Sequence, residues 1–348
     1  MRVTITIIFC LMSTQLCVGQ MTKDSFYYKK IAEQGVKFIS VNEGKYKVFT
    51  QKIGNGKIKM LLLHGGPVNT HEYFENFPEH LKDKGIEIYY YDQLGSYYSD
   101  QPSDTSIWSE ENLIEQIEEV RKGLKLKYFY LLGHSWGGRL AQLYAAKYSK
   151  NLKGLILSNI TPQIRDTAKL NSSKRALTAN IEKQVKALPE FSKISPITMD
   201  SIGERIKIAD TVLYASLVKI YNTKVDSIVR RNFTYRGDTR PEPLIRNGLH
   251  INRKLRDQTP QIFKIFDSDY LLAIEKIKCP VLIIGGFYDR MYQELYPEMK
   301  KHFTNTKVRI YLCPNGSHFC MWDDTENYFS EITRFLKNVE SKSFDPDK

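Results

Sequence analysis

The stretch that decides the fold is residues 131–138, Leu131-Leu132-Gly133-His134-Ser135-Trp136-Gly137-Gly138. An apolar run over 128–132 precedes it, and a helical pattern over 139–146 follows it. A serine presented between a strand and a helix must lie on a tight, strained turn, so Gly133 and Gly137 carry no side chain that could collide there. The start of the helix directs its amides and its positive dipole end toward the place where an oxyanion would form. The pattern predicts that Ser135 is a nucleophile, and an ordinary glycine-rich turn is the alternative.

Seven further segments have the composition of strands. They are 36–41, 46–53, 59–63, 86–91, 152–159, 277–286 and 307–312. The first two alternate apolar and polar residues, as an antiparallel hairpin does, whereas 59–63 is a continuous apolar run typical of a buried parallel strand. Helical spacing of apolar residues marks 110–124 and 328–339. Strands that alternate with helices predict an α/β fold with a largely parallel sheet and helices on its faces.

The pattern changes over 161–270, which is polar, rich in helical spacing and without a convincing buried strand. This segment holds 20 Lys and Arg against 12 Asp and Glu, and it supplies most of the chain's net charge of +12. One interpretation is a solvated helical insertion. The other is a helical cap over the active site, which would shape a pocket and favour acidic partners. The basic residues are scattered and no recognised binding motif accompanies them, so we expect no nucleic-acid partner.

The N-terminus has the features of an export signal. Arg2 precedes a largely apolar stretch, 3–12, that is too short to span a bilayer comfortably, and small residues at 17–19 offer a cleavage site before Gln20. We therefore expect a signal peptide over 1–19, an exported mature chain and no stable membrane insertion after cleavage; an uncleaved anchor is the alternative. The expected organisation is an α/β core over 20–160, a cap over 161–270 and the core again over 271–348.

Removal of the signal peptide leaves Cys279, Cys313 and Cys320. Three cysteines do not make a disulfide framework. Cys313 and Cys320 bracket His318 and a pair between them is an alternative, but we favour buried free thiols. No cluster of His and Cys indicates a metal site, and we expect no cofactor.

Two polar residues after the returning strands complete a candidate catalytic set. Asp289 follows the strand at 277–286 and His318 follows the strand at 307–312. Because parallel strands end at one edge of a sheet, both can meet Ser135 there. His318 would take the proton from Ser135, and Asp289 would hold the imidazole in the right tautomer. The loop after 59–63 contains a glycine pair, so the amides of Gly66 and Trp136 are the predicted oxyanion hole.

These motifs resemble the proline iminopeptidase group of α/β-hydrolases, which includes the tricorn-interacting aminopeptidases. The similarity covers roughly 35–160 and 275–340. It rests on His64-Gly65-Gly66-Pro67, Asp92-Gln93-Leu94-Gly95 with Ser99, the stretch 133–138, and the loops of Asp289 and His318. The resemblance implies an α/β-hydrolase fold and removal of an N-terminal residue, often proline, from short peptides. It also implies a cap whose acidic residues bind the free amine, and Glu204 and Glu242 are candidates because they lie in the cap.

The sequence departs from the family pattern at three places. Val68 and Tyr97 stand where the family usually has glycine, and 247–254 does not match the family's acidic segment. A positive φ at Val68 or Tyr97 would add strain of about 1–3 kcal/mol. These departures leave two alternatives open, namely an esterase or amidase acting on small substrates and a non-catalytic binding protein on a hydrolase scaffold.

Overall fold

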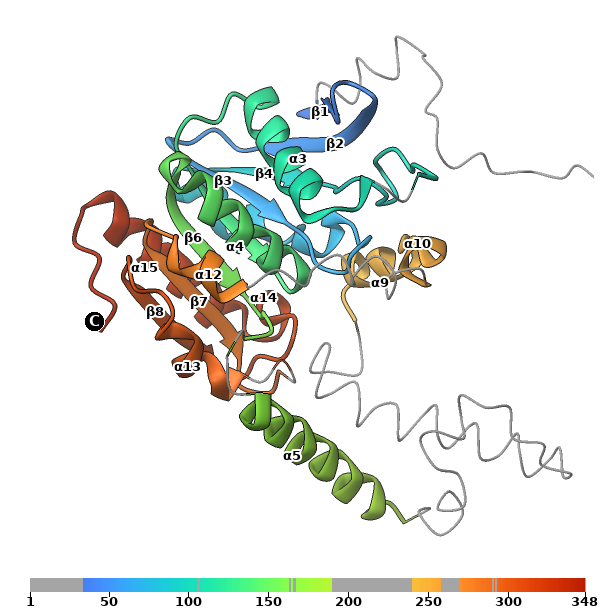
Figure 1. Cartoon of the computed structure of the whole chain (residues 1–348), viewed down its shortest axis with the longest axis vertical. Helices are drawn as coiled ribbons and strands as arrows, with labels where there is room; N and C mark the ends of the chain where they lie inside the picture. Colours follow the sequence, from blue (N-terminus) through green and yellow to red (C-terminus); the bar gives the residue numbers. More distant parts are fainter. Residues whose placement is uncertain are drawn as a thin grey trace, which may run out of the picture.

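The computed structural model describes residues 34–104, 107–162, 164, 167–189, 240–257, 270–289, 291 and 293–347. Its strands are β1 (Val36–Val41), β2 (Tyr46–Ile53), β3 (Ile58–Leu63), β4 (Ile86–Tyr91), β5 (Phe129–His134), β6 (Leu152–Ser158), β7 (Val281–Gly286) and β8 (Val308–Cys313). They form one sheet in the order β1-β2-β4-β3-β5-β6-β7-β8. The pairs β1–β2 and β2–β4 are antiparallel, and all the others are parallel. The predicted α/β fold with a largely parallel sheet is confirmed (Figure 1).

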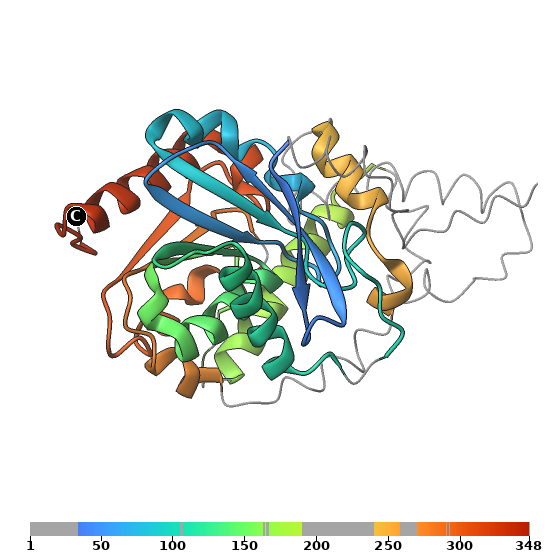
Figure 2. The same ribbon diagram turned by 90° about the horizontal axis from the view of Figure 1, so that it is seen from above.

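The helices cover both faces of this sheet. The α-helices are α2 (Phe77–Leu81), α3 (Glu110–Gly123), α4 (Trp136–Tyr148), α5 (Thr167–Lys186), α9 (Glu242–Leu249), α10 (Arg253–Asp257), α12 (Tyr270–Glu275), α13 (Tyr296–Lys300), α14 (Cys320–Asp323) and α15 (Thr325–Glu340). Short 3-10 helices lie at η1 (His71–Phe74), η2 (Lys82–Lys84), η4 (Ser149–Asn151) and η8 (Gln293–Leu295). Seen from above, α3 and α4 lie on one side of the strands and α2 and α15 on the other (Figure 2).

The core is divided between the two faces by the alternation of side chains along each strand. Leu61 and Leu63 of β3 pack with α3, α4 and α12, whereas Met60 and Leu62 pack with α2 and α15. A strand buried on both faces needs a continuous apolar run, which explains why the central strands could be predicted. The largest difference from prediction is at β7, which begins after Pro280 rather than at 277, because proline has no N–H to join the ladder.

Parts of the predicted insertion, 161–270, lie within the described residues as α5, α9, α10 and the start of α12. The division of the chain at 161 and 270 stays a prediction, and the predicted signal peptide lies outside the described residues. Within the described part of the chain, no helix is both long and apolar enough to cross a membrane.

The cysteines Cys279, Cys313 and Cys320 are buried free thiols, as favoured from the sequence. Burial raises the pKa of the Cys279 thiol to about 12, so this residue behaves as a small apolar side chain.

Candidate active site

Ser135 lies on the turn between β5 and α4 and has φ 53° and ψ −120°, a conformation that L-residues rarely adopt. The flanking glycines are required by close approach of the backbone. A Cβ atom on Gly137 would lie 2.2 Å from the Leu63 carbonyl oxygen, and one on Gly133 would lie 2.3 Å from the Gly137 carbonyl oxygen. The steric reason inferred from the sequence is confirmed. The tight turn presents Ser135 to a cavity.

Asp289 and His318 come together at the ends of β7 and β8. The His318 Nδ1 atom is 3.2 and 3.1 Å from the two carboxylate oxygens of Asp289, and both side chains are buried. The Met291 amide donates a further hydrogen bond to the carboxylate at 3.1 Å. Because Nδ1 donates to Asp289, Nε2 is the basic nitrogen of the ring. His318 lines the same cavity as Ser135, so the structure brings all three predicted residues to one edge of the sheet.

Asn159, which the sequence reasoning missed, joins the two loops that carry Asp289 and His318. It follows β6 with φ 51°, a left-handed conformation that asparagine tolerates better than most residues. Its Nδ2 group donates to Asp289 Oδ2 at 2.8 Å and to the Ser317 carbonyl at 2.9 Å. The only signal in the sequence was a polar residue directly after a buried strand.

A second missed group links the glycine loop to the histidine loop through His134. The His134 Nε2 atom is 2.8 Å from the His318 carbonyl oxygen, so Nε2 is the protonated nitrogen and Nδ1 is an acceptor. The Tyr73 hydroxyl lies 3.1 Å from that Nδ1 and accepts a hydrogen bond from the Gly65 amide. Burial, together with the nearby His318, lowers the pKa of His134 well below its usual value. His134 is therefore a neutral bridge with a fixed tautomer.

The predicted oxyanion amides are those of Gly66 and Trp136. The Gly65 carbonyl accepts a hydrogen bond from His64 Nδ1 at 2.8 Å, and the Gly65–Gly66 peptide is trans. In a trans peptide the C=O and N–H point in opposite directions, so the Gly66 amide is directed away from His64. Both glycines line the cavity. Trp136 is the first residue of α4, and amides of a first helical turn have no partner within the helix.

His64 is held by several hydrogen bonds and can therefore fix the orientation of the Gly65–Gly66 peptide. Its Nε2 atom accepts the Gln93 amide at 3.0 Å and is 3.2 Å from the Ser96 hydroxyl. Burial lowers the pKa of His64, which keeps the ring neutral with its proton on Nδ1. The first motif of the family resemblance thus orients a backbone amide rather than supplying a reacting side chain.

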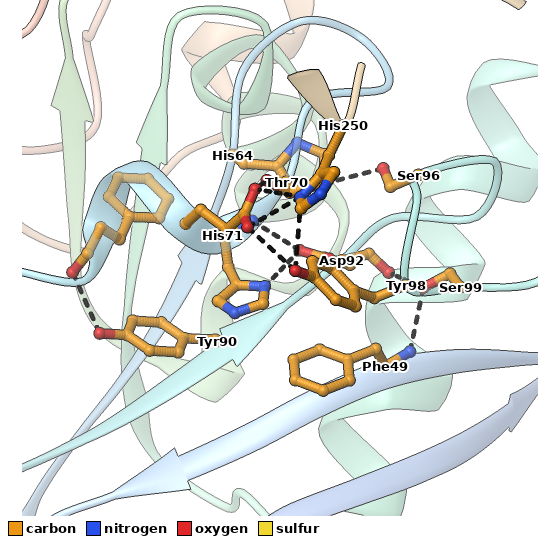
Figure 3. Close-up of polar contacts among 12 residues, drawn as sticks. Phe49, His64, Thr70, His71, Tyr90, Asp92, Ser96, Tyr98, Ser99 and His250 are labelled. Atoms are coloured by element: carbon orange, nitrogen blue, oxygen red, sulfur yellow. Dashed lines mark hydrogen bonds and ion pairs between the residues drawn. The ribbon is translucent and has the colours of Figure 1, made fainter. Parts of the chain in front are cut away.

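The second motif, Asp92 to Ser99, stabilises the loop beside the glycine loop. Asp92 Oδ1 accepts the His71 amide at 2.6 Å and lies 2.9 Å from His71 Nδ1. The Ser99 hydroxyl donates to the Asp92 carbonyl at 2.6 Å (Figure 3). Burial lowers the pKa of His71, but the carboxylates of Asp92, Glu75 and Glu72 together outweigh it and the pKa is raised. This cluster is a structural support of the site.

A buried carboxylate connects this support to α9. Glu72 is fully buried, and its oxygens lie 2.7 Å from the Thr70 hydroxyl and 2.9 Å from the Tyr98 hydroxyl. Two side chains at the end of α9 contact this carboxylate. Arg246 Nη1 lies 3.0 Å from Glu72 Oε1, and Nδ1 of His250, the residue after α9, lies 2.9 Å from the same oxygen. Figure 3 shows His250 directed toward Thr70 and Tyr98. Glu72 therefore anchors α9 to the core beside the cavity.

Two of the three departures from the family pattern, Val68 and Tyr97, stand where the family usually has glycine, and the structure treats them differently. Val68 has φ 64° and a buried side chain, so the expected strain is present there. Tyr97 has no positive φ, and its ring stacks on His250 with 4.1 Å between the ring centroids. Tyr97 thus packs against the end of α9 without backbone strain.

The cavity in front of Ser135 has a volume of about 280 Å³. The core supplies one wall, and α9, α10 and Arg240 supply another. None of the lining residues in the described part of the chain is Asp or Glu. The described residues also contain no group of three or more His, Cys, Asp and Glu that could hold a metal ion.

The carboxylates proposed for amine recognition are not brought to the cavity by the described structure. Glu242 is the first residue of α9, its side chain is 67% exposed, and Glu242 Oε1 lies 2.5 Å from Arg246 Nε. It does not line the cavity. The helix turns this side chain toward solvent and an i,i+4 partner, and a role of Glu242 in amine recognition stays a prediction. Glu204 lies outside the described residues.

Comparisons with known proteins agree with this geometry. The family model for the alpha/beta hydrolase fold matches residues 59–195. The proline iminopeptidase of Elizabethkingia meningoseptica is 34% identical over 322 residues, which cover 88% of this chain and 99% of that protein. That of Flavobacterium johnsoniae is 37% identical over 309 residues, covering 86% and 96%.

A solved structure supports the fold alone. The proline iminopeptidase of Mycobacterium smegmatis superposes with a TM-score of 0.68 at 16% identity, covering 89% of this chain and all of that one. The eight-stranded sheet, the serine turn and similarity to relatives over nearly their full length lead to one assignment. The chain is a serine hydrolase that belongs to the proline iminopeptidase family of α/β hydrolases.

Proposed function

We propose that this chain is an exported aminopeptidase that removes an N-terminal residue, such as proline, from short peptides through Ser135, His318 and Asp289. The observation that carries the proposal is the buried Asp289–His318 pair, whose histidine lines the same cavity as a strained serine. The relatives that match nearly all of the chain bear the name proline iminopeptidase, which supports a peptide substrate.

The proposed reaction uses each group at a defined atom. Ser135 Oγ attacks the scissile carbonyl carbon while His318 Nε2 takes its proton, and the buried Asp289 carboxylate stabilises the imidazolium. The carbonyl oxygen becomes an oxyanion, which accepts hydrogen bonds from the amides of Gly66 and Trp136. His318 then gives its proton to the leaving amine as the C–N bond breaks, leaving an acyl-enzyme. Water, activated by His318, hydrolyses the Ser135 ester and releases the N-terminal residue.

Export and the cap belong to the same proposal. The signal-like segment 1–19 supports export, and the N-terminal sequence of the mature protein tests it, with Gln20 as the expected first residue. The segment 161–270 is proposed as the cap, because α9 and α10 contribute to the cavity wall. A mature protein that retains residues 1–19 would contradict the export proposal.

The activity is tested by comparing free and blocked substrates. Purified protein is assayed with Pro- and Ala-p-nitroanilide, with their N-acetylated forms and with p-nitrophenyl butyrate. Faster cleavage of the free amides, by a factor of about 10² in kcat/KM, is expected if the site discriminates the free amine. Equal cleavage of free and acetylated amides, or cleavage of the ester alone, would replace the aminopeptidase with the esterase or amidase alternative.

A further inference from the structure

The described wall of the cavity is cationic. Arg240 lies two residues before α9 and Arg256 lies in α10, and both residues line the cavity that contains Ser135 and His318. No described lining residue is a carboxylate. A cleft lined by one sign of charge attracts ligands of the opposite sign, because the field lines are concentrated within it.

Asn247 adds a neutral donor to the same wall. Its Oδ1 atom accepts the Thr70 amide at 3.0 Å, so the amide oxygen is turned toward the core. The NH₂ group, which can only donate, is the end of the side chain that can face a ligand. The position of Asn247 is fixed in two ways. The Arg246–Glu72 ion pair anchors α9, and the Thr70 hydroxyl also donates to Asn247 Oδ1. The polar side chains of α9 and α10 on this wall, Asn247 and Arg256, can thus both donate to an acceptor.

We propose that Arg240 and Arg256 form a subsite for a substrate carboxylate, and that the preferred substrates are dipeptides with a free C-terminus. The inference rests on the proposed aminopeptidase activity and names its substrate class. In a dipeptide the carboxylate lies on the leaving residue, a few bonds from the scissile carbonyl. A guanidinium group has five N–H donors in a planar fork, so it can bind a carboxylate while it keeps another contact.

The size of the cavity agrees with such a substrate. Its volume of about 280 Å³ is near the lower end of the range of ligand pockets, about 300–1,000 Å³. A carboxylate held by arginine would also orient the peptide along the cavity, with the scissile carbonyl at Ser135. Longer peptides would carry an uncharged amide at that place.

The experiment measures how well peptides protect Ser135 from a fluorophosphonate, so that it does not depend on turnover. Mature wild-type protein is labelled in the presence of Pro-Ala with a free C-terminus or of Pro-Ala amide. We expect the free acid to protect at concentrations about tenfold lower than the amide, the scale of one hydrogen bond to a charged group. Arg240→Gln and Arg256→Gln should each reduce this difference, and Arg→Lys at the same positions should restore part of it.

Arg253→Gln is the matched control, because Arg253 lies on the same short helix as Arg256, is exposed and does not line the cavity. The Arg253→Gln variant should keep the wild-type difference between the protecting concentrations of Pro-Ala and Pro-Ala amide. Equal protection by acid and amide in the wild type would overturn the subsite, as would a difference that both Gln variants retain. Cleavage of Pro-Ala is followed in the same samples. Selective protection by the free acid without cleavage of Pro-Ala would refute the aminopeptidase activity while supporting the subsite. Failure of the proposed activity can therefore be distinguished from failure of the proposed subsite.

Discussion

The anchoring of α9 by Glu72 leads to a quantitative prediction for Arg246→Met. The Arg246 guanidinium lies 3.0 Å from the fully buried Glu72 carboxylate and also contacts Glu75 and Glu242. Methionine keeps much of the side-chain length and removes the charge. Glu72 would then lose its permanent cation and, among the described residues, keep Tyr98, Thr70 and His250 as partners.

The expected loss in the free energy of unfolding of Arg246→Met lies between two limits. Breaking a fully buried ion pair costs about 3–5 kcal/mol, whereas a solvent-exposed pair contributes about 0–1 kcal/mol. Arg246 is 32% exposed and Glu72 retains hydrogen bonds, so we expect a loss of about 2 kcal/mol in the free energy of unfolding. For a chain of 348 residues this lowers Tm by about 3 °C. Glu242→Gln removes the outer, 67% exposed partner of the same arginine and should change the stability by less than about 0.5 kcal/mol.

The assay is urea unfolding of wild type, Arg246→Met and Glu242→Gln, followed by circular dichroism, with KM measured for each folded protein. Arg246→Met should also raise KM, because α9 carries Leu244 and Asn247 in the cavity wall. Equal unfolding midpoints for wild type and Arg246→Met, or equal losses for the two variants, would refute the reasoning.

Three further predictions follow from the site. Gly137→Ala should cost about 3 kcal/mol of unfolding free energy, because its Cβ would meet backbone at 2.2 Å, and a wild-type urea midpoint would contradict this. Tyr73→Phe should lower kcat by about tenfold or more with little change in KM, since the bridge through His134 positions groups around the reaction; an unchanged kcat would contradict it. Because the folded pKa of His71 beside Asp92 is raised, its stabilisation is fully present below about pH 6.5 and is lost as pH rises through the folded pKa. The difference in urea midpoint between wild type and His71→Asn should therefore shrink from pH 5.5 to 8.5, and a difference that grows would contradict the sign.

The fold could be predicted from the sequence because its signals are local. Apolar runs of strand length, helical spacing between them and the Gly133–Gly137 pattern each depend on residues near one another in the chain. The positions of Asp289 and His318 followed from the same strands, since each residue lies in the loop that follows a strand. The sequence order of the strands then left few arrangements of a parallel sheet.

The supporting contacts could not be predicted because they join distant residues. The Tyr73–His134 contact spans 61 positions, Asn159–Asp289 spans 130 and Glu72–Arg246 spans 174. Each depends on which side chains the fold places together. The side chain of Glu242 is held away from the cavity by a local contact, because Arg246 lies four residues later on the same helix and offers an i,i+4 partner.

The whole proposed reaction depends on Ser135 being an activated nucleophile. The most direct test is labelling of the mature protein with a fluorophosphonate, followed by mass-spectrometric mapping of the modified peptide. We expect one adduct, on Ser135, and no adduct in a Ser135→Ala variant that has the far-ultraviolet circular dichroism spectrum of the wild type. An unlabelled wild type, or an adduct that persists in Ser135→Ala, would contradict it.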